Sequence, residues 1–479
     1  GRRAFRFLSS AVTTTTSILA NWQEGVNNNT TITNNNPNPG FGTHITGSVS
    51  GTNGFDATQT TNASMYAFNN SSGAWTTVLN TDVNNLVAGV PYRIMIRGDR
   101  SINLNTNTPT PTNTVLRATG TLYTGQKEVT GLNQNAGGYS FVGNPYQAPV
   151  DMSRVLQAST NLNANFVYYW DPQLNTRGAY VSYDVVNKMT ESQSTQSNEY
   201  LQPGQACFVK TVATGAASLS FQESYKQVNT ANRNVFKVTN SASTLRLKLY
   251  EGNAFLTSGK SADALLIQFA SGQNNEVDGY DANKFTNLDE NFATKNNATL
   301  LSIERRALPQ AEEIVPLHVN QYRNTNYTIV AEASNIEEGI TPFLVDNYTQ
   351  IYTEIPATGA VTYNYSVLSS DAQSVSSSRF NIVFKASSTL DVKSNELVSG
   401  LKLYPNLVKD GWFMMSSSSD IQNIEIEIFN VLGQKIPFKT TNIDANTLKI
   451  EPSKSAAKGV YWVKMKHDGR ISTQKIIVN

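Results

Sequence analysis

The apolar residues of this chain are confined to short segments that Gly, Asn, Pro or Asp interrupt. Ile94-Met95-Ile96 follows Pro91-Tyr92, and the segment Phe166 to Trp170 runs directly into Asp171-Pro172. In Leu245 to Tyr250, apolar and charged residues alternate with the period of two that turns one strand face toward a core. Short segments of this kind are typical of strands joined by turns. We therefore predict an all-β fold of tandem β-sandwiches, Ig-like or jelly-roll-like.

Length and charge limit the number of domains and the kinds of partner. The 479 residues exceed what a single hydrophobic core supports, so we expect several domains. Lys plus Arg nearly balances Asp plus Glu, 37 against 36, and the net charge is +1. Such a chain has no field that would attract nucleic acid, so we expect no nucleic-acid partner. Charged residues make up only 15%, with Asn, Thr and Ser in their place, which is typical of an extracellular β protein.

Two stretches in the first half of the chain resemble each other. Residues 86–94 align with residues 201–209, because in each a Leu is followed three residues later by a Gly and then by a strand. Gly89 and Gly204 can both adopt the positive φ of a turn that leads into this strand. We interpret the pair as a diverged repeat, with chance similarity as the alternative.

These patterns divide the chain into four units and a linker. The two predicted repeats occupy residues 1–125 and 126–228, and further strand-like segments predict a third β-sandwich over 229–386. Residues 387–400 are polar and lack periodicity, which is typical of a linker. The last unit, residues 401–479, is predicted to be a small Ig-like sandwich.

The last unit consists of short motifs in a defined order. Tyr404-Pro405-Asn406 indicates a turn, because proline fixes φ and asparagine tolerates turn conformations. From Ile424 to Ile428, isoleucine alternates with glutamate, which predicts a half-buried strand. Asn430 to Gln434 then predicts a hairpin connection. Gly459 to Met465 and Lys475 to Val478 predict the two strands that follow.

The order of these motifs resembles the type A C-terminal sorting domain of the Bacteroidetes type IX (Por) secretion system. The positions that carry the resemblance are Tyr404, Pro405, Asn406, Asn430, Leu432, Gly433, Gln434, Gly459, Tyr461, Lys475, Ile476, Ile477 and Val478. Leu407 stands where the family usually has a second proline, and the other motifs match.

The resemblance implies that this unit is an export signal without catalytic activity or cofactor. It implies a protein secreted across the outer membrane to the cell surface or the extracellular space. The implied partners are a PorV-like shuttle barrel of the outer membrane and the translocon pore. After export, the domain is either retained or removed by a sortase-like peptidase.

The last strand is the segment of this unit that a partner could reach most directly. Lys475 to Val478 runs almost to Asn479, so a partner could bind the terminal carboxylate together with an open strand edge. The alternative is that Ile476 and Val478, or Ile477 on the opposite face, only fill the core.

The residues that usually carry catalysis are few and scattered. The three histidines, His44, His318 and His467, fall in different predicted units, and metal-binding spacings, a P-loop and a nucleophile elbow are absent from the sequence. The single cysteine, Cys207, lies in an apolar segment and is predicted to be buried. We therefore expect that the chain is not an enzyme and binds no cofactor.

An acidic stretch is the one candidate for a metal site. Asp278, Asp281 and Asp289 could supply the clustered oxygens that Ca²⁺ prefers, with a solvated turn as the alternative. Arg97-Gly98-Asp99 matches the integrin-binding tripeptide, but a turn after a strand also requires glycine and aspartate there.

Aromatic residues suggest a second kind of ligand. Trp75, Trp170, Tyr168 and Tyr169 could stack on the sugar rings of surface glycans. Alternation along Phe166 to Trp170 predicts that half of this segment instead faces a core.

Two functions fit these features. The first is a non-enzymatic surface protein, in which stacked β-sandwiches form an adhesin or a stalk. The second is a set of accessory or carbohydrate-binding domains of a larger secreted hydrolase, with the catalytic domain upstream of Gly1. We interpret Gly1 as a cut end, because an exported protein needs an inner-membrane signal. The lack of catalytic motifs favours the first function.

Limited proteolysis tests the predicted linker. Residues 387–400 lack apolar periodicity and join two self-contained cores, so we expect the first cuts there and a stable fragment that ends near Ser394. Mass spectrometry of the fragments locates the cuts. First cuts within 229–386 would contradict the predicted boundary.

Overall fold

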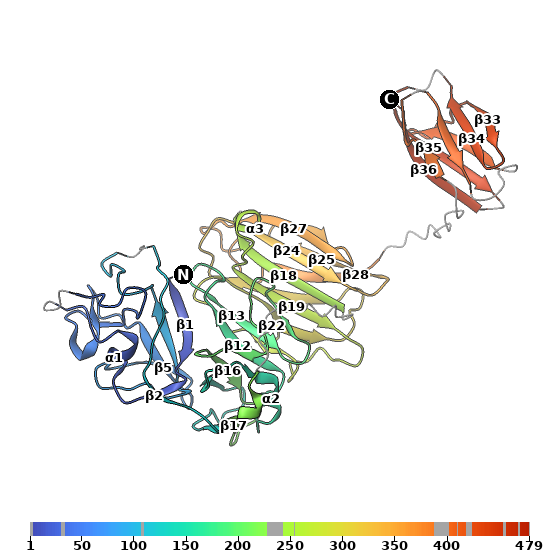
Figure 1. Ribbon diagram of the computed structural model, residues 1–479. Coiled ribbons are helices and arrows are strands. Elements are labelled where there is room, and N and C mark those ends of the chain that lie inside the picture. Colours follow the sequence, from blue (N-terminus) through green and yellow to red (C-terminus); the bar gives the residue numbers. More distant parts are fainter. Residues whose placement is uncertain are drawn as a thin grey trace. The chain divides into compact units, whose positions relative to one another are not determined.

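The computed structural model describes residues 3–29, 34–106, 110–227, 243–252, 254–387, 402–409, 411–417, 424–453, 457–467 and 470–478. The chain forms two compact units, residues 1–387 and 388–479 (Figure 1). Strands dominate both units, which confirms the predicted all-β fold. Apart from Ser387, the predicted linker lies outside the described residues. No described helix is long and apolar enough to cross a membrane.

A four-stranded antiparallel sheet forms the first part of the large unit, in the order β1-β7-β5-β6. Its strands are β1 (Ala4–Ser9), β5 (Met65–Asn69), β6 (Ala74–Thr77) and β7 (Pro91–Ile96). Around it lie β2 (Val12–Thr14), α1 (Ile18–Trp22), β3 (Thr46–Ser48), the single turn η1 (Thr52–Gly54), β4 (Asp56–Ala57) and β8 (Gly120–Leu122). Helix α1 begins after Ser17, whose side chain accepts the N–H of Ala20.

A second sheet follows in the order β10-β16-β12-β13-β14. Its strands are β10 (Tyr139–Gly143), β12 (Phe166–Asp171), β13 (Ala179–Asp184), β14 (Met189–Thr190) and β16 (Ala206–Lys210). One of its faces is covered by β9 (Lys127–Val129), β11 (Val150–Asp151), α2 (Met152–Gln157), β15 (Tyr200–Leu201), β17 (Leu219–Phe221) and the turn η2 (Glu223–Tyr225). Asp151 caps α2 by accepting the N–H of Ser153.

The first two sheets share one topology. The order β1-β7-β5-β6 corresponds to β10-β16-β12-β13, because each sheet pairs its first strand with its last and then adds a hairpin. Gly89 and Gly204 precede the last strands with φ of +78° and +72°, as the turn argument predicts. This common topology supports a diverged repeat. The boundaries at 125/126 and 228/229 stay predictions.

The third sheet has eleven strands and encloses its own core. It runs β26-β25-β28-β23-β21-β22-β19-β18-β24-β27, with β20 paired to β22. Its strands are β18 (Ser243–Glu251), β19 (Asp263–Phe269), β20 (Ala282–Asn283), β21 (Asn291–Asn296), β22 (Thr299–Arg306), β23 (Ile314–Asn320), β24 (Asn326–Ser334), β25 (Ile340–Asp346), β26 (Ile351–Glu354), β27 (Gly359–Ser366) and β28 (Phe380–Ala386), and α3 (Ala254–Thr257) follows β18. Leu344 from one end of the sheet and Tyr365 from the other belong to one core, so the sheet curls on itself.

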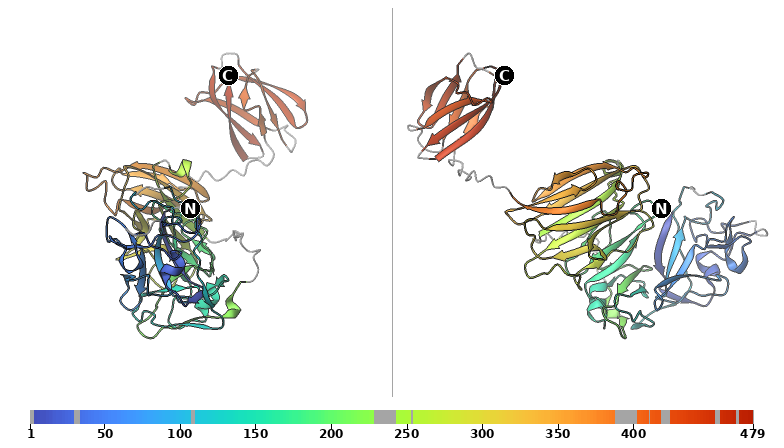
Figure 2. Two further views of the ribbon diagram at one scale, coloured as in Figure 1. Left: turned by 60° about the vertical axis from the view of Figure 1, so that its left-hand side comes forward. Right: turned by 180° about the vertical axis from the view of Figure 1, so that it is seen from behind.

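Both faces of the second sheet are buried. On β12, Val167 and Tyr169 face the core that contains α2, whereas Phe166, Tyr168 and Trp170 face a second core on the opposite side. That second core joins the first sheet to the second and also includes residues of the third. The right-hand view of Figure 2 shows the three sheets in this succession, from blue through green to orange.

Aromatic rings fill this shared core, which we call the interlayer aromatic cluster. Its principal members are Phe7, Phe68, Trp75, Phe141, Trp170, Tyr180, Phe208 and Phe285. Phe208 lies at its centre, with ring centroids 4.8 Å from Phe141, 4.9 Å from Phe68 and 5.4 Å from Phe285. Phe141 belongs to the same sheet as Phe208, Phe68 belongs to the first sheet, and Phe285 lies in the loop after β20 of the third sheet, so the cluster packs the three sheets together.

The small unit is a sandwich of two four-stranded sheets around one core. One sheet has the order β29-β31-β34-β33 and the other the order β30-β36-β35-β32. The strands are β29 (Lys402–Tyr404), β30 (Leu407–Val408), β31 (Phe413–Ser416), β32 (Glu425–Asn430), β33 (Phe438–Asp444), β34 (Thr447–Pro452), β35 (Gly459–His467) and β36 (Arg470–Val478). Alternate residues of β35, such as Tyr461, Val463 and Met465, face the core.

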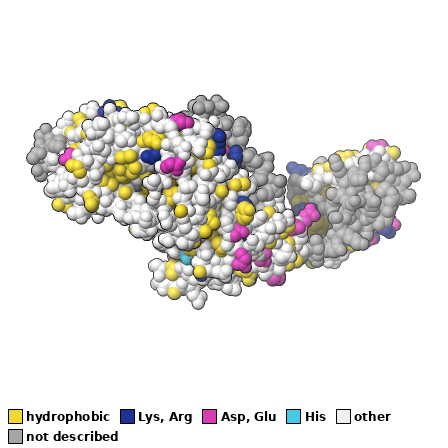
Figure 3. Space-filling model, turned by 90° about the horizontal axis from the view of Figure 1, so that it is seen from below, with side chains coloured by type: hydrophobic (Ala, Val, Ile, Leu, Met, Phe, Trp, Pro, Cys, Tyr) yellow, Lys and Arg dark blue, Asp and Glu magenta, His cyan; other side chains and the backbone are white. Residues whose placement is uncertain are grey.

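Among the described residues on the face shown in Figure 3, few side chains are charged. Uncharged polar side chains and backbone cover most of this described surface, with scattered hydrophobic patches. This surface agrees with the low content of charged residues in the sequence.

Replacement of Phe208 tests the interlayer aromatic cluster. We expect Phe208→Ala to lower the free energy of unfolding by about 3 to 5 kcal/mol, because it leaves a cavity where the three sheets pack together. Leu79→Ala, at a site that is 75% exposed, is the control and should change the value by less than about 0.5 kcal/mol. Calorimetry of the full chain measures both. Equal stability of the two variants would contradict the central position of Phe208.

Candidate functional site

The motif residues of the small unit come together mainly on one sheet. Asn430 ends β32, Gly459 and Tyr461 lie on β35, and residues 475–478 lie on β36. These strands are neighbours in the order β30-β36-β35-β32. Tyr404 ends β29 on the other sheet, and Pro405 and Asn406 connect it to β30. We call the sheet formed by β30, β36, β35 and β32 the terminal sheet.

The hairpin connection after β32 explains why its motif contains asparagine, glycine and glutamine. The side-chain oxygen of Asn430 accepts the N–H of Leu432 at 3.0 Å and that of Gln434 at 2.9 Å. Its amide nitrogen donates to Oε1 of Gln434 at 2.8 Å, and the N–H of Gly433 donates to the Asn430 carbonyl. Leu432 makes no core contact in this turn, and its side chain is 79% exposed. The turn therefore presents an apolar side chain to solvent.

Tyr461 fixes the start of β35. Its ring is buried in the core, and its hydroxyl donates to the carbonyl of Ala457 at 2.6 Å. Residue 461 pairs with Ile476 in the antiparallel register of β35 and β36. The tyrosine of this motif therefore has a structural role, because it ties the loop before β35 to the core.

The last strand presents different residues on its two faces. Ile476 is fully buried, and Val478 packs against the same core, whereas Ile477 on the opposite face is 39% exposed. Lys475 is also exposed. The sequence alternatives thus apply to different residues, because Ile476 fills the core and Ile477 does not.

The expectation of an open edge at this strand is wrong for its last residues. Strand β36 pairs with β35 on one side and in parallel with β30 on the other, which aligns Leu407 with Ile477 and Val408 with Val478. The N–H of Ile477 donates to the carbonyl of Asn406 at 2.7 Å. The edge is therefore already occupied by residues from the beginning of the unit. Asn479 lies outside the described residues.

The outer face of the terminal sheet carries an exposed aromatic residue that sequence analysis missed. Trp462 is 45% exposed and lies opposite Lys475 in the register of β35 and β36. Phe429 of β32 pairs with it from the other side. The sequence could have indicated this exposure, because successive side chains of a strand point to opposite faces and Tyr461 faces the core.

The calcium candidates do not converge on one site. Asp281 accepts the N–H groups of Asp278 and Arg305, each at 2.8 Å, and burial raises its pKa to about 6. Asp289 instead binds the guanidinium of Arg177, whose Nε lies 2.7 Å from Oδ1. Within the described part of the chain, no group of three or more His, Cys, Asp or Glu side chains is arranged to hold a metal ion.

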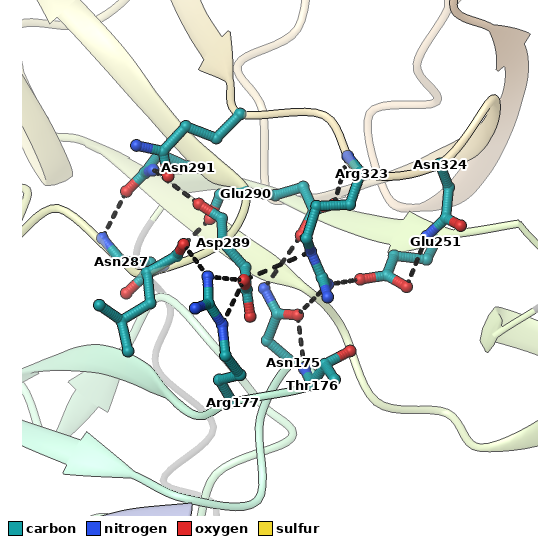
Figure 4. A network of polar contacts seen from close by, with 12 residues as sticks. Asn175, Thr176, Arg177, Glu251, Asn287, Asp289, Glu290, Asn291, Arg323 and Asn324 are labelled. Atoms are coloured by element: carbon teal, nitrogen blue, oxygen red, sulfur yellow. Dashed lines mark hydrogen bonds and ion pairs between the residues drawn. The ribbon is translucent and has the colours of Figure 1, made fainter. Parts of the chain in front are cut away.

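Asp289 belongs to a polar network that joins the second and third sheets (Figure 4). Arg323 lies at its centre and binds Glu290 at 3.0 Å, and it also pairs with Glu251. Asn175, in the loop between β12 and β13, accepts from Arg323 at 2.7 Å. The carboxylates of this network are therefore committed to guanidinium partners, which is a structural arrangement.

The histidines are placed in separate parts of the structure. His44 is buried and lies 3.0 Å from Asp56, which also binds Arg100 at 2.7 Å. Burial alone would raise the pKa of Asp56, but the hydrogen bonds and charges of His44 and Arg100 lower it to about 2. His318 lies on β23, and the side chain of His467 lies outside the described residues.

The remaining candidates are buried. Cys207 is buried as predicted, and burial raises the pKa of its thiol. Tyr168, Tyr169 and Trp170 are buried because both faces of β12 are covered, and Trp75 is half-buried in the interlayer aromatic cluster. Within Arg97-Gly98-Asp99, the aspartate is buried and accepts the N–H of Gly40 and the hydroxyl of Thr112, each at 2.8 Å. This tripeptide forms a structural turn.

Comparison with known proteins identifies two families along the chain. The family described as Domain of unknown function (DUF8693) matches residues 43–384, more than half of the chain, and the Secretion system C-terminal sorting domain matches residues 402–479. The second match confirms the resemblance to the type IX sorting domain. None of the curated proteins matches the chain.

Similar solved structures include the mouse coronavirus receptor-binding domain complexed with its murine receptor, at 10% identity and a TM-score of 0.13, covering 32% of this chain and 92% of that one. The neural ectodermal development factor IMP-L2 is also similar, at 10% identity and a TM-score of 0.12, covering 40% of this chain and 94% of that one. Neither likeness supports a statement about this chain.

Two neighbouring isoleucines test the two faces of the last strand. We expect Ile476→Asn to destabilise the small unit by about 3 to 5 kcal/mol, because it removes core packing and buries an unpaired amide. The matched variant Ile477→Asn should change the stability by less than about 0.5 kcal/mol. Hydrogen exchange of β32 and β35 in the full chain measures both. A larger effect of Ile477→Asn would mean that the assigned faces are reversed.

Proposed function

Because this chain belongs to the DUF8693 family and carries a type IX sorting domain, we propose that residues 1–387 form a non-catalytic passenger, an adhesin or a stalk. The sorting domain makes the chain a cargo of type IX secretion, exported across the outer membrane to the cell surface or the extracellular space.

The observation that carries this proposal is how the passenger uses its buried charges. Asp346 and Arg379 are paired at 2.7 Å with almost no exposure of either side chain. Lys284 and Asp263 are paired at the same distance and are equally buried. Together with the network around Arg323, these pairs hold strands and loops together. Such use of charge supports a structural or binding protein.

We further propose that a PorV-like shuttle barrel binds the outer face of the terminal sheet and then hands the chain to the translocon pore. Trp462 and Ile477 lie on this face, and both expose apolar surface that the core does not use. Leu432 extends from the adjoining turn and is more exposed still. Exposed apolar side chains that are close together are typical of binding surfaces. A sortase-like peptidase that removes the domain after export belongs to the same proposal.

A fusion tests the sorting assignment. A fluorescent protein joined to residues 401–479 should leave a cell that has a type IX system, because the signal is contained in the small unit. Cell fractionation and fluorescence of the medium or of intact cells measure export. Retention of the intact fusion in the periplasm would contradict the assignment.

Two variants of this fusion separate recognition from folding. Trp462→Ala leaves the core untouched, so we expect the fusion to fold but to be exported less, by about fivefold or more. The control Ile443→Ala removes an exposed side chain from β33 of the other sheet and should be exported normally. Equal export of the Trp462→Ala and Ile443→Ala fusions would contradict the proposal that the outer face is the binding surface.

The passenger's role needs a separate measurement in cells. Cells that display the full chain should attach to a solid surface more than cells whose chain lacks residues 402–479. The truncated chain should remain in the periplasm. Display without any gain in attachment would refute the adhesin role, and hydrolytic turnover by the purified chain would refute the non-catalytic role.

A further inference from the structure

An exposed groove lies at the open end of the third sheet. It runs between edge strand β27 and the hairpin formed by β25 and β26, and its volume is about 580 Å³. Most of its lining consists of tyrosines and small polar residues, among them Tyr348, Thr349, Tyr363 and Asn364, and Arg379 also contributes. This volume lies within the usual range of small-molecule sites. The groove is assembled from segments that are distant in sequence.

Tyr348 presents an aromatic ring to this groove in a fixed position. The guanidinium of Arg379 lies 4.8 Å from the ring centroid and covers one face. The hydroxyl of Tyr348 donates to Oδ2 of Asp371 at 2.9 Å, which fixes the end of the side chain. The residue is nevertheless 38% exposed, so part of its ring is accessible from the groove. A ring that is held before a ligand arrives loses little entropy on binding.

The charges at the base of the groove compensate each other. Arg379 donates to Asp346 through Nε at 3.0 Å and through Nη2 at 2.7 Å. The hydroxyl of Tyr363 donates to the same carboxylate at 2.7 Å. Asp346 and Arg379 are almost completely buried. The groove therefore offers neither a free cation nor a free carboxylate from this pair, which disfavours a strongly charged ligand.

Neutral polar groups also line the groove. Oδ1 of Asn364 accepts the hydroxyl of Thr328 at 2.7 Å, which fixes the orientation of the amide and turns its N–H groups away from that bond. The hydroxyls of Thr349 and Tyr363 lie 3.2 Å apart and can each share a further hydrogen bond. Amide and hydroxyl groups that line one groove together with an exposed aromatic ring match the alternating hydroxyl and C–H surfaces of a sugar.

We propose that this groove binds a neutral oligosaccharide, with a sugar ring stacked on Tyr348 and its hydroxyls bonded to Asn364 and Thr349. The inference rests on the proposed function, because it supplies the ligand class of a displayed adhesin. The proposed glycan contacts are therefore the groove residues and not Trp75, Tyr168, Tyr169 and Trp170, which are buried or half-buried.

Isothermal titration of the full chain tests the proposal. The probes are cellohexaose, laminarihexaose, xylohexaose and mannohexaose, with hexagalacturonate as the charged comparison. We expect at least one neutral hexasaccharide to bind, and Tyr348→Ala to weaken it by about tenfold or more. The matched control is Tyr352→Ala on β26, which removes an exposed tyrosine outside the groove and should leave the affinity unchanged.

A second variant distinguishes loss of binding from loss of folding. Asn364→Ala alters an exposed side chain, and we expect it to weaken binding about fivefold without changing the circular dichroism spectrum. No binding of the neutral probes at about 5 mM, binding of hexagalacturonate alone, or unchanged affinity in both groove variants would overturn the proposal. These outcomes leave the secretion assays untouched. Failure of export in cells would in turn leave the titrations of the purified chain unaffected.

Discussion

The contact on which the large unit depends is the interlayer aromatic cluster around Phe208. Rings from the first two sheets meet there with Phe285, which follows β20 of the third sheet, and the second sheet is apolar on both faces. A sheet buried on both faces cannot form alone, because one face would remain in water. The three sheets therefore behave as one body, in agreement with the single compact unit formed by residues 1–387. The three β units predicted over residues 1–386 therefore have a core in common.

Polar contacts fix the relative orientation of the sheets, which aromatic packing alone does not determine. Ring packing tolerates some sliding, whereas a guanidinium that binds a carboxylate has a defined geometry. The network around Arg323 fixes the loop between β12 and β13 against the third sheet. The Asp346–Arg379 pair fixes the β25–β26 hairpin against β28 and β27 in the same way. The second pair also supports Tyr348, so a structural contact prepares the proposed sugar site.

Local patterns predicted the strands and turns, and contacts between distant segments explain what could not be predicted. The period of two in β12 and the positive φ at Gly89 and Gly204 depend only on residues that are close in sequence, so they could be predicted. The burial of Trp170 depends on the first sheet, whose position the local pattern does not encode. The groove at Tyr348 likewise requires Asn364 and Arg379 to approach through the curl of the third sheet. The sorting motif was recognisable because its order is linear.

The parallel pairing of β30 with β36 joins the first and last parts of the small unit in one sheet. Strand β30 forms almost at the beginning of this unit and β36 at its end, so the terminal sheet is complete only when both segments are present and folded. A chain that lacks either segment leaves unpaired backbone groups along the other. The outer face of this sheet, which we propose as the binding surface for the export machinery, therefore forms only when both ends of the unit are in place. In the proposed recognition mode, a truncated or unfolded unit would present no binding surface.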